Sequence, residues 1–353
     1  MNISEIHYQS PKNAIAMVED CLYARLVPML HGSPAIGKSS IVHQLADRLN
    51  LLVIDARMAG FDPTDLQGFP TFDTEKGLAS YMPMDIFPLE GKELPINPKT
   101  GLAYAGWLLF LDEFNSAPLA VQAAAYKLIL DRMVGSHKLH KNCAIVAAGN
   151  LDDDGAITNP MSSAMVSRIV HIVVKPSLPE WLDWAGDVKI SSKITSFLEF
   201  KTGMFYTFDA GEPAHIYASP RTWEFADRLI KRWNDDVPFD KQALLAGTIS
   251  EGVTTEFRSF LAYYSQLPTL ADIIKFPMSV PVPTLPGVLY ALDGMLADCM
   301  DKDNMEQLLQ YVDRLPAEHR IILFRTAIRK NKTIRTIPAF LKWATDNASV
   351  FIH

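Results

Sequence analysis

Cysteine is scarce in this chain of 353 residues, which holds only Cys21, Cys143 and Cys299. Their odd number and wide spacing argue against a disulfide scaffold or a zinc site and indicate reduced thiols. No run of about 18 apolar residues occurs, so no membrane-spanning helix is expected. The first residues lack the basic and then apolar segments of a signal peptide. We therefore expect a cytoplasmic protein with no membrane partner.

Basic residues are not in excess either. The chain has 33 Lys and Arg against 40 Asp and Glu, which gives a formal net charge of −7. This balance disfavours nucleic-acid binding over the whole surface, although it leaves room for a local basic patch. With 48% hydrophobic and 21% charged residues, the composition excludes collagen-like, coiled-coil and wholly disordered chains. The length suggests about two domains.

Apolar runs alternate with helical patterns in the first half of the chain. Because continuously apolar strands that alternate with helices indicate a parallel sheet covered on both faces, we predict an α/β core. After Pro176, helical patterns dominate, and a proline cluster between Pro277 and Pro286 predicts a linker or sharp turn. The five expected strands are Leu26–Leu30, Leu51–Ile54, Trp107–Leu111, Cys143–Ala148 and Ile169–Val174.

Residues 32–39 read Gly-Ser-Pro-Ala-Ile-Gly-Lys-Ser and fit the phosphate-loop pattern G-x-x-x-x-G-K-[ST]. Glycines let the backbone curl so that its N–H groups point at phosphate oxygens, and the following helix start adds positive potential. In this pattern Lys38 reaches the β- and γ-phosphates, and the Ser39 hydroxyl coordinates Mg²⁺. The alternative is a Gly-rich turn with an exposed lysine. The candidate ATP-binding residues are Gly32, Ser33, Pro34, Ala35, Ile36, Gly37, Lys38, Ser39 and Ser40.

A second motif is an apolar strand that ends in two acids, Asp112 and Glu113. Strand alternation is expected to place the two side chains on opposite sides, and therefore in different roles. Asp112 can hold Mg²⁺ together with Ser39, and Glu113 can act as the general base on the attacking water. Two solvated acids at a strand end are the alternative. Downstream of a phosphate loop, the functional interpretation is favoured.

With both motifs in place, the chain resembles the AAA+ ATPases, specifically their MoxR-like, dynein-related group of phage and bacterial type. The resemblance covers residues ~10 to ~235 and implies an AAA+ core with a helical lid, ATP hydrolysis with Mg²⁺, and a homo-oligomeric ring, with a hexamer as the expected form. It implies the domains 1–176 (AAA+ core) and 177–240 (lid), and a bacterial or phage-infected cell as the setting. The remaining residues, 241–353, are expected to form a C-terminal helical extension from their helical patterns. Beyond the two motifs, the resemblance rests on the segments 62–68, 114–117, 128–132, 147–150, 161–168 and 219–221.

The resemblance also suggests roles for single polar residues. Asn150 ends a strand where the family has its sensor-one asparagine, and a neutral amide there can align water or read the γ-phosphate; a simple turn-former is the alternative. Arg168 corresponds to the arginine finger, which neutralises charge on a neighbouring subunit's γ-phosphate. Arg132 is the rival for that role. Arg221 matches the start of the sensor-two helix, where an arginine is unfavourable for the helix dipole and so suggests a role other than stability.

Three weaker sequence features each allow two interpretations. In the resembled family, the long segment 59–105 carries an inserted hairpin or helix that faces the central pore. Its aromatic residues either contact a client or pack locally. His31 is expected to be structural rather than a base. A basic run from Arg325 to Arg335 either binds nucleic acid or an acidic partner, or is a solvated helix end. The aromatic residues are Phe69, Phe72, Tyr81 and Phe87.

These expectations lead to two functional hypotheses from different classes. The first is a chaperone-like ATPase ring that remodels or activates a protein client, and the resemblance adds a von Willebrand factor A type protein as a candidate partner. The second is a nucleic-acid-directed motor or loader, against which the net charge of −7 weighs. A non-catalytic scaffold is disfavoured because Lys38, Asp112, Glu113 and Arg168 are all present.

Overall fold

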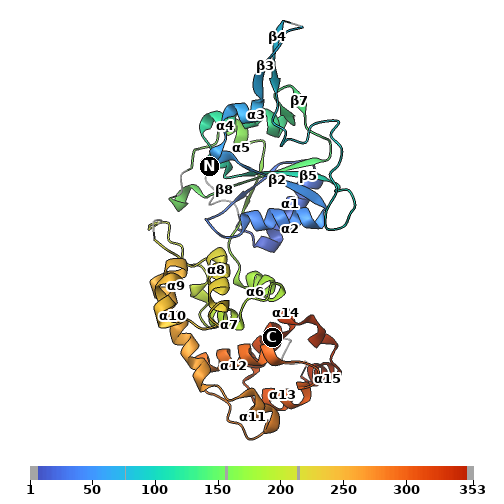
Figure 1. Cartoon of the computed structure of the whole chain (residues 1–353). Coiled ribbons are helices and arrows are strands. Elements are labelled where there is room, and N and C mark those ends of the chain that lie inside the picture. Colours follow the sequence, from blue (N-terminus) through green and yellow to red (C-terminus); the bar gives the residue numbers. More distant parts are fainter. Residues whose placement is uncertain (1–6, 76, 156–157, 213–214, 348–353) are drawn as a thin grey trace. The chain divides into compact units, whose positions relative to one another are not determined.

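The computed structural model describes residues 7–75, 77–155, 158–212 and 215–347. The chain divides into two compact units. The first runs to Pro176 and takes in a short segment that begins at Asp209, and the second contains the rest. Figure 1 shows the strands in the first unit and the helices α6 to α15 in the second.

The first unit contains a five-stranded sheet and α-helices that alternate with its strands along the chain. Its α-helices and strands are α1 (Pro11–Tyr23), β1 (Pro28–His31), α2 (Lys38–Arg48), β2 (Leu51–Arg57), α3 (Pro63–Gln67), β3 (Phe69–Asp73), β4 (Leu78–Met82), β5 (Gly106–Asp112), α4 (Leu119–Leu130), β6 (Met133–Val134), β7 (His137–Lys138), β8 (Cys143–Gly149), α5 (Ser163–Val166) and β9 (Val170–Val173). Its 3-10 helices are η2 (Met58–Gly60), η3 (Phe114–Ser116) and η4 (Asp152–Asp154).

The sheet has the strand order β2-β5-β8-β1-β9, and each neighbouring pair is parallel. Because β8 lies between β5 and β1, the residues that follow these three strands meet at one edge of the sheet. The phosphate loop follows β1, Asp112 ends β5, and Asn150 follows β8. The expected fold class is confirmed as an α/β fold with a five-stranded parallel sheet, followed by helices.

The core of the first unit explains why these segments form strands and helices. Residues Gly106–Leu111 of β5 are all buried, as expected of a central parallel strand. Helix α2 buries Ile41, Val42 and Leu45, which recur at helical spacing. The first strand begins at Pro28 rather than at the expected Leu26. Arg25 takes a left-handed φ of 58°, and the Leu26 side chain is 50% exposed, so the turn after α1 extends further than the apolar run suggests.

The long segment 59–105 contains an antiparallel hairpin of β3 and β4, in which Phe69 pairs with Met82. Figure 1 shows this hairpin projecting away from the sheet. Of the four aromatic residues expected there, Phe69, Phe72 and Tyr81 are on the hairpin and exposed, and Phe72 is 85% exposed. Phe87 is 1% exposed and packs into the core of the first unit, so for this residue the structure agrees with packing and not with a client contact.

Helices are the only regular secondary structure in the described part of the second unit, and their side chains form two hydrophobic cores. One core gathers residues of α6 to α10, with Trp223 and Phe197 among its largest side chains, and the other gathers residues of α11 to α15. Helix α12 contributes to both cores. The helices are α6 (Leu178–Asp187), α7 (Ser192–Phe200), η5 (Thr202–Met204), α8 (Pro220–Lys231), η6 (Phe239–Lys241), α9 (Gln242–Ile249), α10 (Glu251–Leu261), η7 (Ala262–Gln266), α11 (Leu270–Lys275), α12 (Pro286–Cys299), α13 (Met305–Val312), α14 (Ala317–Lys330), η8 (Lys332–Thr336) and α15 (Pro338–Asp346).

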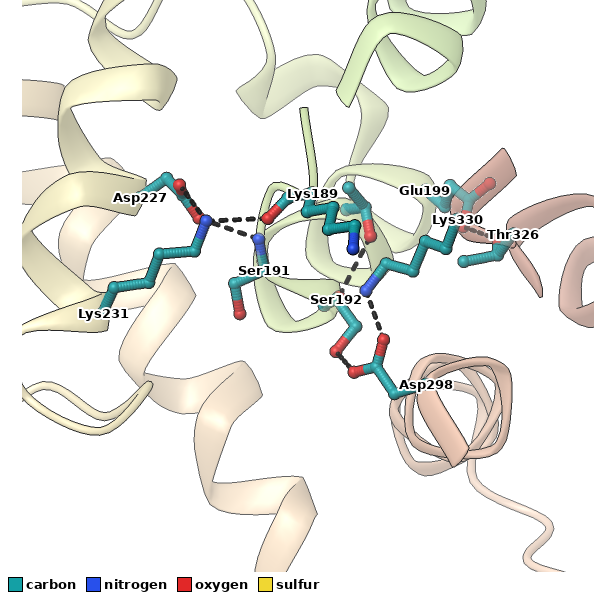
Figure 2. Close-up of polar contacts among 10 residues, drawn as sticks. Lys189, Ser191, Ser192, Glu199, Asp227, Lys231, Asp298, Thr326 and Lys330 are labelled. Carbon is teal, nitrogen blue, oxygen red and sulfur yellow. Dashed lines mark hydrogen bonds and ion pairs between the residues drawn. The ribbon is translucent and has the colours of Figure 1, made fainter. Parts of the chain in front are cut away.

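Polar contacts tie the helices of the second unit together, as Figure 2 shows. The Nζ of Lys231 on α8 lies 2.7 Å from both Asp227 Oδ2 and the carbonyl oxygen of Lys189. On the other side, Asp298 of α12 accepts from the Ser192 hydroxyl and from Lys330 of α14.

This network also accounts for part of the basic run between Arg325 and Arg335. Lys330 pairs with Asp298, Lys332 pairs with Asp187, and Arg329 pairs with both Asp183 and Glu199. Three of the five basic side chains are thus held in ion pairs within the second unit. Arg325, Lys332 and Arg335 are nevertheless exposed, so the run is in part the solvated helix end that the sequence allowed and in part a set of ion pairs between helices.

Two composition-based expectations can be compared with the structure. Cys21, Cys143 and Cys299 are free thiols. Within the part of the chain that the structure describes, no helix combines the length and apolar character needed to cross a bilayer.

Candidate nucleotide-binding site

The phosphate loop joins β1 to α2, and two of its residues must be glycine for different reasons. Gly37 is the N-cap of α2 with a φ of 99°, a conformation that L side chains rarely adopt. A Cβ on Gly32 would lie 2.4 Å from Ile36 Cδ1 and 2.9 Å from the Val174 carbonyl oxygen. Ala35 also has a positive φ, of 61°. The loop is therefore curled in the way that turns backbone N–H groups toward an anion.

Lys38 is the cation at the centre of the loop. Its Nζ donates to the carbonyl oxygens of Gly32 and Ser33, at 2.5 and 3.1 Å, and to Oδ1 of Asn150, at 3.0 Å. The ammonium group thus lies where the β1 loop and the end of β8 meet. Its oxygen partners are the kind of acceptor that phosphate oxygens can replace.

Ser39 and Asp112 lie together, as expected for a shared magnesium site. The Ser39 hydroxyl donates to Asp112 Oδ2 at 3.3 Å, and the Glu113 backbone N–H donates to Asp112 Oδ1 at 2.9 Å. Among the described residues, no group of three or more His, Cys, Asp or Glu side chains is placed to hold a metal ion alone. These oxygens fit a Mg²⁺ whose remaining ligands are phosphate oxygens and water.

Glu113 lies beside this pair but outside strand β5, which ends at Asp112. The expected strand alternation therefore does not decide the direction of its side chain. Glu113 has a φ of 54° and caps η3, and this left-handed turn separates its exposed carboxylate from the half-buried Asp112. The two acids thus have different surroundings because of this turn, and not because of the predicted strand alternation.

Asn150 is held through its backbone by a residue to which the sequence analysis gave no role. The side-chain amide of Asn115, in η3, donates to the Asn150 carbonyl oxygen at 2.8 Å. The Asn150 N–H donates in turn to Asn115 Oδ1 at 3.1 Å. Two features of the sequence could have pointed to Asn115. It lies two residues after the acidic pair, and a glycine, Gly149, precedes Asn150 and leaves space for a neighbouring side chain.

The two candidate arginine fingers have different environments. Arg168 follows α5 and is exposed, and its Nη1 donates to the Tyr126 hydroxyl and to the Ala164 carbonyl oxygen, both at 2.8 Å. Its guanidinium carbon also lies 5.2 Å from the centre of the Tyr126 ring. Arg132 is half-buried and donates to the carbonyl oxygen of Cys143. Arg132 thus contacts its own sheet, whereas Arg168 is at the surface.

Arg221 belongs to the second unit, at the second residue of α8. Its side chain is exposed, and Ser219 caps the helix by accepting from the Thr222 N–H at 3.2 Å. A complete capping box means that the helix start does not need Arg221 for its stability.

His31 ends β1 next to the phosphate loop and is almost fully buried. Its Nε2 lies 2.8 Å from His171 Nδ1 on the neighbouring strand β9. Burial, with His171 and Lys38 nearby, lowers the pKa of His31 to about 3. A group with this pKa is neutral at physiological pH, which agrees with the expected structural role.

No family model and no curated protein sequence matches this chain. Solved structures that are similar include a putative ATPase from Cytophaga hutchinsonii, with 12% identity over 95% of this chain and 90% of that chain and a TM-score of 0.35. A point mutant of RuvB from Thermotoga maritima has 15% identity, 85% and 86% coverage and a TM-score of 0.40. The Thermotoga maritima RuvB Holliday junction branch migration motor has 17% identity, 84% and 83% coverage and a TM-score of 0.36. These weak likenesses carry no argument about substrate or partner.

Proposed function

We propose that this protein hydrolyses ATP in a homo-oligomeric ring of the AAA+ type, with a MoxR-like hexamer as the expected form, and uses the cycle to remodel or activate a protein client. The observation that carries the ATPase proposal is the meeting of Lys38, Ser39, Asp112 and Asn150. Lys38 Nζ lies 3.0 Å from Asn150 Oδ1, and the Ser39 hydroxyl lies 3.3 Å from Asp112 Oδ2. Both contacts are at one edge of the parallel sheet.

In this proposal, ATP supplies the phosphoryl group and Mg²⁺ offsets its charge. The curled loop from Gly32 to Ser40 binds the phosphates through backbone N–H groups, and Lys38 exchanges its oxygen partners for phosphate oxygens. Ser39 and Asp112 are the residues that hold Mg²⁺. Glu113, whose carboxylate is exposed, takes the proton of the attacking water, and the Asn150 amide orients that water.

The surface position of Arg168, which contacts Tyr126 of its own subunit, supports the proposed ring. A finger on the surface can complete a neighbouring subunit's site, which makes hydrolysis depend on assembly. Arg221 is proposed to read the γ-phosphate and to couple the helices after residue 177 to the nucleotide state. On this view residues 1–176 form the ATPase core, 177–240 the lid and 241–353 a helical extension.

The proposed client is a protein, with a von Willebrand factor A type partner as the candidate that the family resemblance suggests. The exposed aromatic residues of the β3–β4 hairpin support a protein contact, because aromatic side chains are enriched in protein interfaces. The basic run after Arg325 does not favour a nucleic acid, because three of its members are ion-paired. The proposal places this activity in the cytoplasm of a bacterial or phage-infected cell.

The direct test replaces Lys38. We expect Lys38→Ala to abolish ATP binding, measured by titration with a fluorescent ATP analogue, because the phosphates lose their main cation. Lys127→Ala is the matched control, since that lysine is exposed on α4, and it should bind as the wild type does. Unchanged ATP hydrolysis by Lys38→Ala would refute the site. Stimulation of hydrolysis by DNA that disappears at high salt would redirect the client proposal to nucleic acid.

A further inference from the structure

Asn150 lies at a point where the parallel sheet no longer supplies hydrogen-bond partners. The register of β1 with β8 extends as far as His31 and Gly149, and that of β5 with β8 as far as Leu111 and Ala147. The backbone of Asn150 is therefore one residue beyond the ladder with β1 and three residues beyond the ladder with β5. Its N–H and C=O groups still need partners, since it is only half-exposed.

The carboxamide of Asn115 takes the place of the missing strand. It accepts from the Asn150 N–H and donates to the Asn150 C=O, at 3.1 and 2.8 Å. A carboxamide is suited to this contact because it offers a donor and an acceptor side by side. Asn115 is itself 2% exposed, and its backbone carbonyl oxygen accepts from the backbone N–H of Asn159 at 2.6 Å. Both ends of the contact are thus held in place.

Gly149 makes room for this arrangement. A Cβ at that position would lie 2.1 Å from Asn115 Oδ1 and 2.7 Å from Asn115 Cγ. Any larger residue at position 149 would therefore push the carboxamide away from Asn150. The need for a small residue before Asn150 is explained by the approach of Asn115.

We propose that Asn115 is a positioning residue of the ATPase site: by pairing with the backbone of Asn150, it holds the Asn150 amide against Lys38. This inference rests on the proposed function. Asn115 lies in η3, which begins directly after Glu113, so the same residue links the segment of the general base to the segment of the water-orienting amide. A displacement of either segment is transmitted to the other. Misplacement by about 1 Å is enough to lower turnover by roughly 10²-fold.

The test compares Asn115→Ala, Asn150→Ala and the double variant in the full-length protein. We expect each single variant to lower kcat for ATP by about 10- to 100-fold, with the affinity for a fluorescent ADP analogue within about twofold of the wild type. Because Asn115 acts through Asn150, the double variant should be no slower than Asn150→Ala. Gly149→Ala should reproduce the effect of Asn115→Ala without altering either asparagine.

Asn159→Ala is the matched control. It removes a side-chain hydrogen bond to the carbonyl oxygen of Ala117, in the same part of the chain, and leaves the Asn115–Asn150 pair intact. Its kcat should stay within about twofold of the wild type. If Asn115→Ala does not fold, Gly149→Ala answers the same question, because its Cβ displaces the Asn115 carboxamide and leaves both asparagines in the chain.

Three results would overturn the inference. They are a normal kcat in Asn115→Ala, multiplicative losses in the double variant, and a kcat loss in Asn159→Ala equal to that in Asn115→Ala. Each would make Asn115 a structural residue or one without effect. Failure of the proposed function is a different outcome, because Lys38→Ala would then hydrolyse ATP normally. If Lys38→Ala is inactive and Asn150→Ala is slowed, a normal kcat in Asn115→Ala contradicts only the positioning role of Asn115. The ATPase proposal then stands.

Discussion

Lys38 Nζ donates to Asn150 Oδ1 over 3.0 Å, so the lysine of the phosphate loop contacts the asparagine that follows β8, 112 residues later in the chain. The same ammonium group is bonded to two carbonyl oxygens of its own loop. Movement of Lys38 toward a bound phosphate therefore changes the partners of the Asn150 amide. In the proposed function, this one contact couples nucleotide binding to the orientation of the attacking water.

Glu113→Gln is expected to separate ATP binding from hydrolysis. The amide keeps the size of the side chain but cannot accept a proton, so turnover should fall by about 10²- to 10⁴-fold while ATP still binds. Phosphate release and nucleotide titration measure the two properties, and size-exclusion chromatography with ATP should show assembled rings. Glu93→Gln, at another exposed glutamate, is the control. Normal turnover in Glu113→Gln would place the general base elsewhere.

Mixing two inactive variants tests whether Arg168 acts between subunits. Arg168→Ala alone should lower turnover by about 10³-fold, because the γ-phosphate loses its neutralising charge. In mixtures with Glu113→Gln, some interfaces pair an intact Glu113 with an intact Arg168, and phosphate release should partly recover.

Arg132→Ala provides the comparison for that experiment. Since Arg132 donates to the carbonyl oxygen of Cys143, its loss should lower the melting temperature more than the turnover. If no ratio of Arg168→Ala to Glu113→Gln restores activity, a finger acting between subunits is ruled out.

Gly32→Ala should damage the phosphate loop by crowding. Its Cβ would meet the Val174 carbonyl oxygen at 2.9 Å as well as the Ile36 side chain, and crowding of a packed site costs about 1–3 kcal/mol. We expect ATP affinity to fall by about tenfold or more, measured by titration. Gly60→Ala meets nothing within 4 Å and should bind ATP as the wild type does. Equal affinities in the two variants would contradict the close packing of the loop.

The second unit should lose stability as the pH rises from about 5 to 7. Burial raises the pKa of Glu199 from 4.5 to about 7, although Arg329 and Thr326 oppose the shift, and burial raises that of Asp293 to about 6. In this window the folded state binds more protons than the unfolded state, so the free energy of unfolding decreases with rising pH.

Glu199→Gln should make that decrease smaller by about 1–3 kcal/mol, because the amide mimics the protonated acid. Thermal unfolding followed by tryptophan fluorescence measures it well, since five of the six tryptophans lie in the second unit. Part of the pH dependence should persist through Asp293. A wild type whose melting temperature rises over this window would contradict the assignment.

Much of the fold could be read from local patterns. The continuous apolar run before Asp112 indicated a buried parallel strand, and the glycines and lysine of residues 32–38 indicated the phosphate loop that follows β1. These signals work because burial and backbone conformation act on neighbouring residues. The same patterns could not decide between the two interpretations of Phe87, because an aromatic side chain looks the same in sequence whether it faces a client or, as the structure has it, the core.

The sequence by itself determined which side chains are available to this protein: the glycines, lysine and serine of the loop at residues 32–39, the paired acids, and the asparagine and arginines proposed to act with them. Only the tertiary structure decided which of them meet. The order of the strands places β8 between β5 and β1 and so brings Asn115, Asn150 and Lys38 together. It also engages Arg132 with its own sheet and leaves Arg168 at the surface. The physical reason is that these contacts join residues up to 112 positions apart, and their partners are set by strand pairing and packing rather than by local pattern.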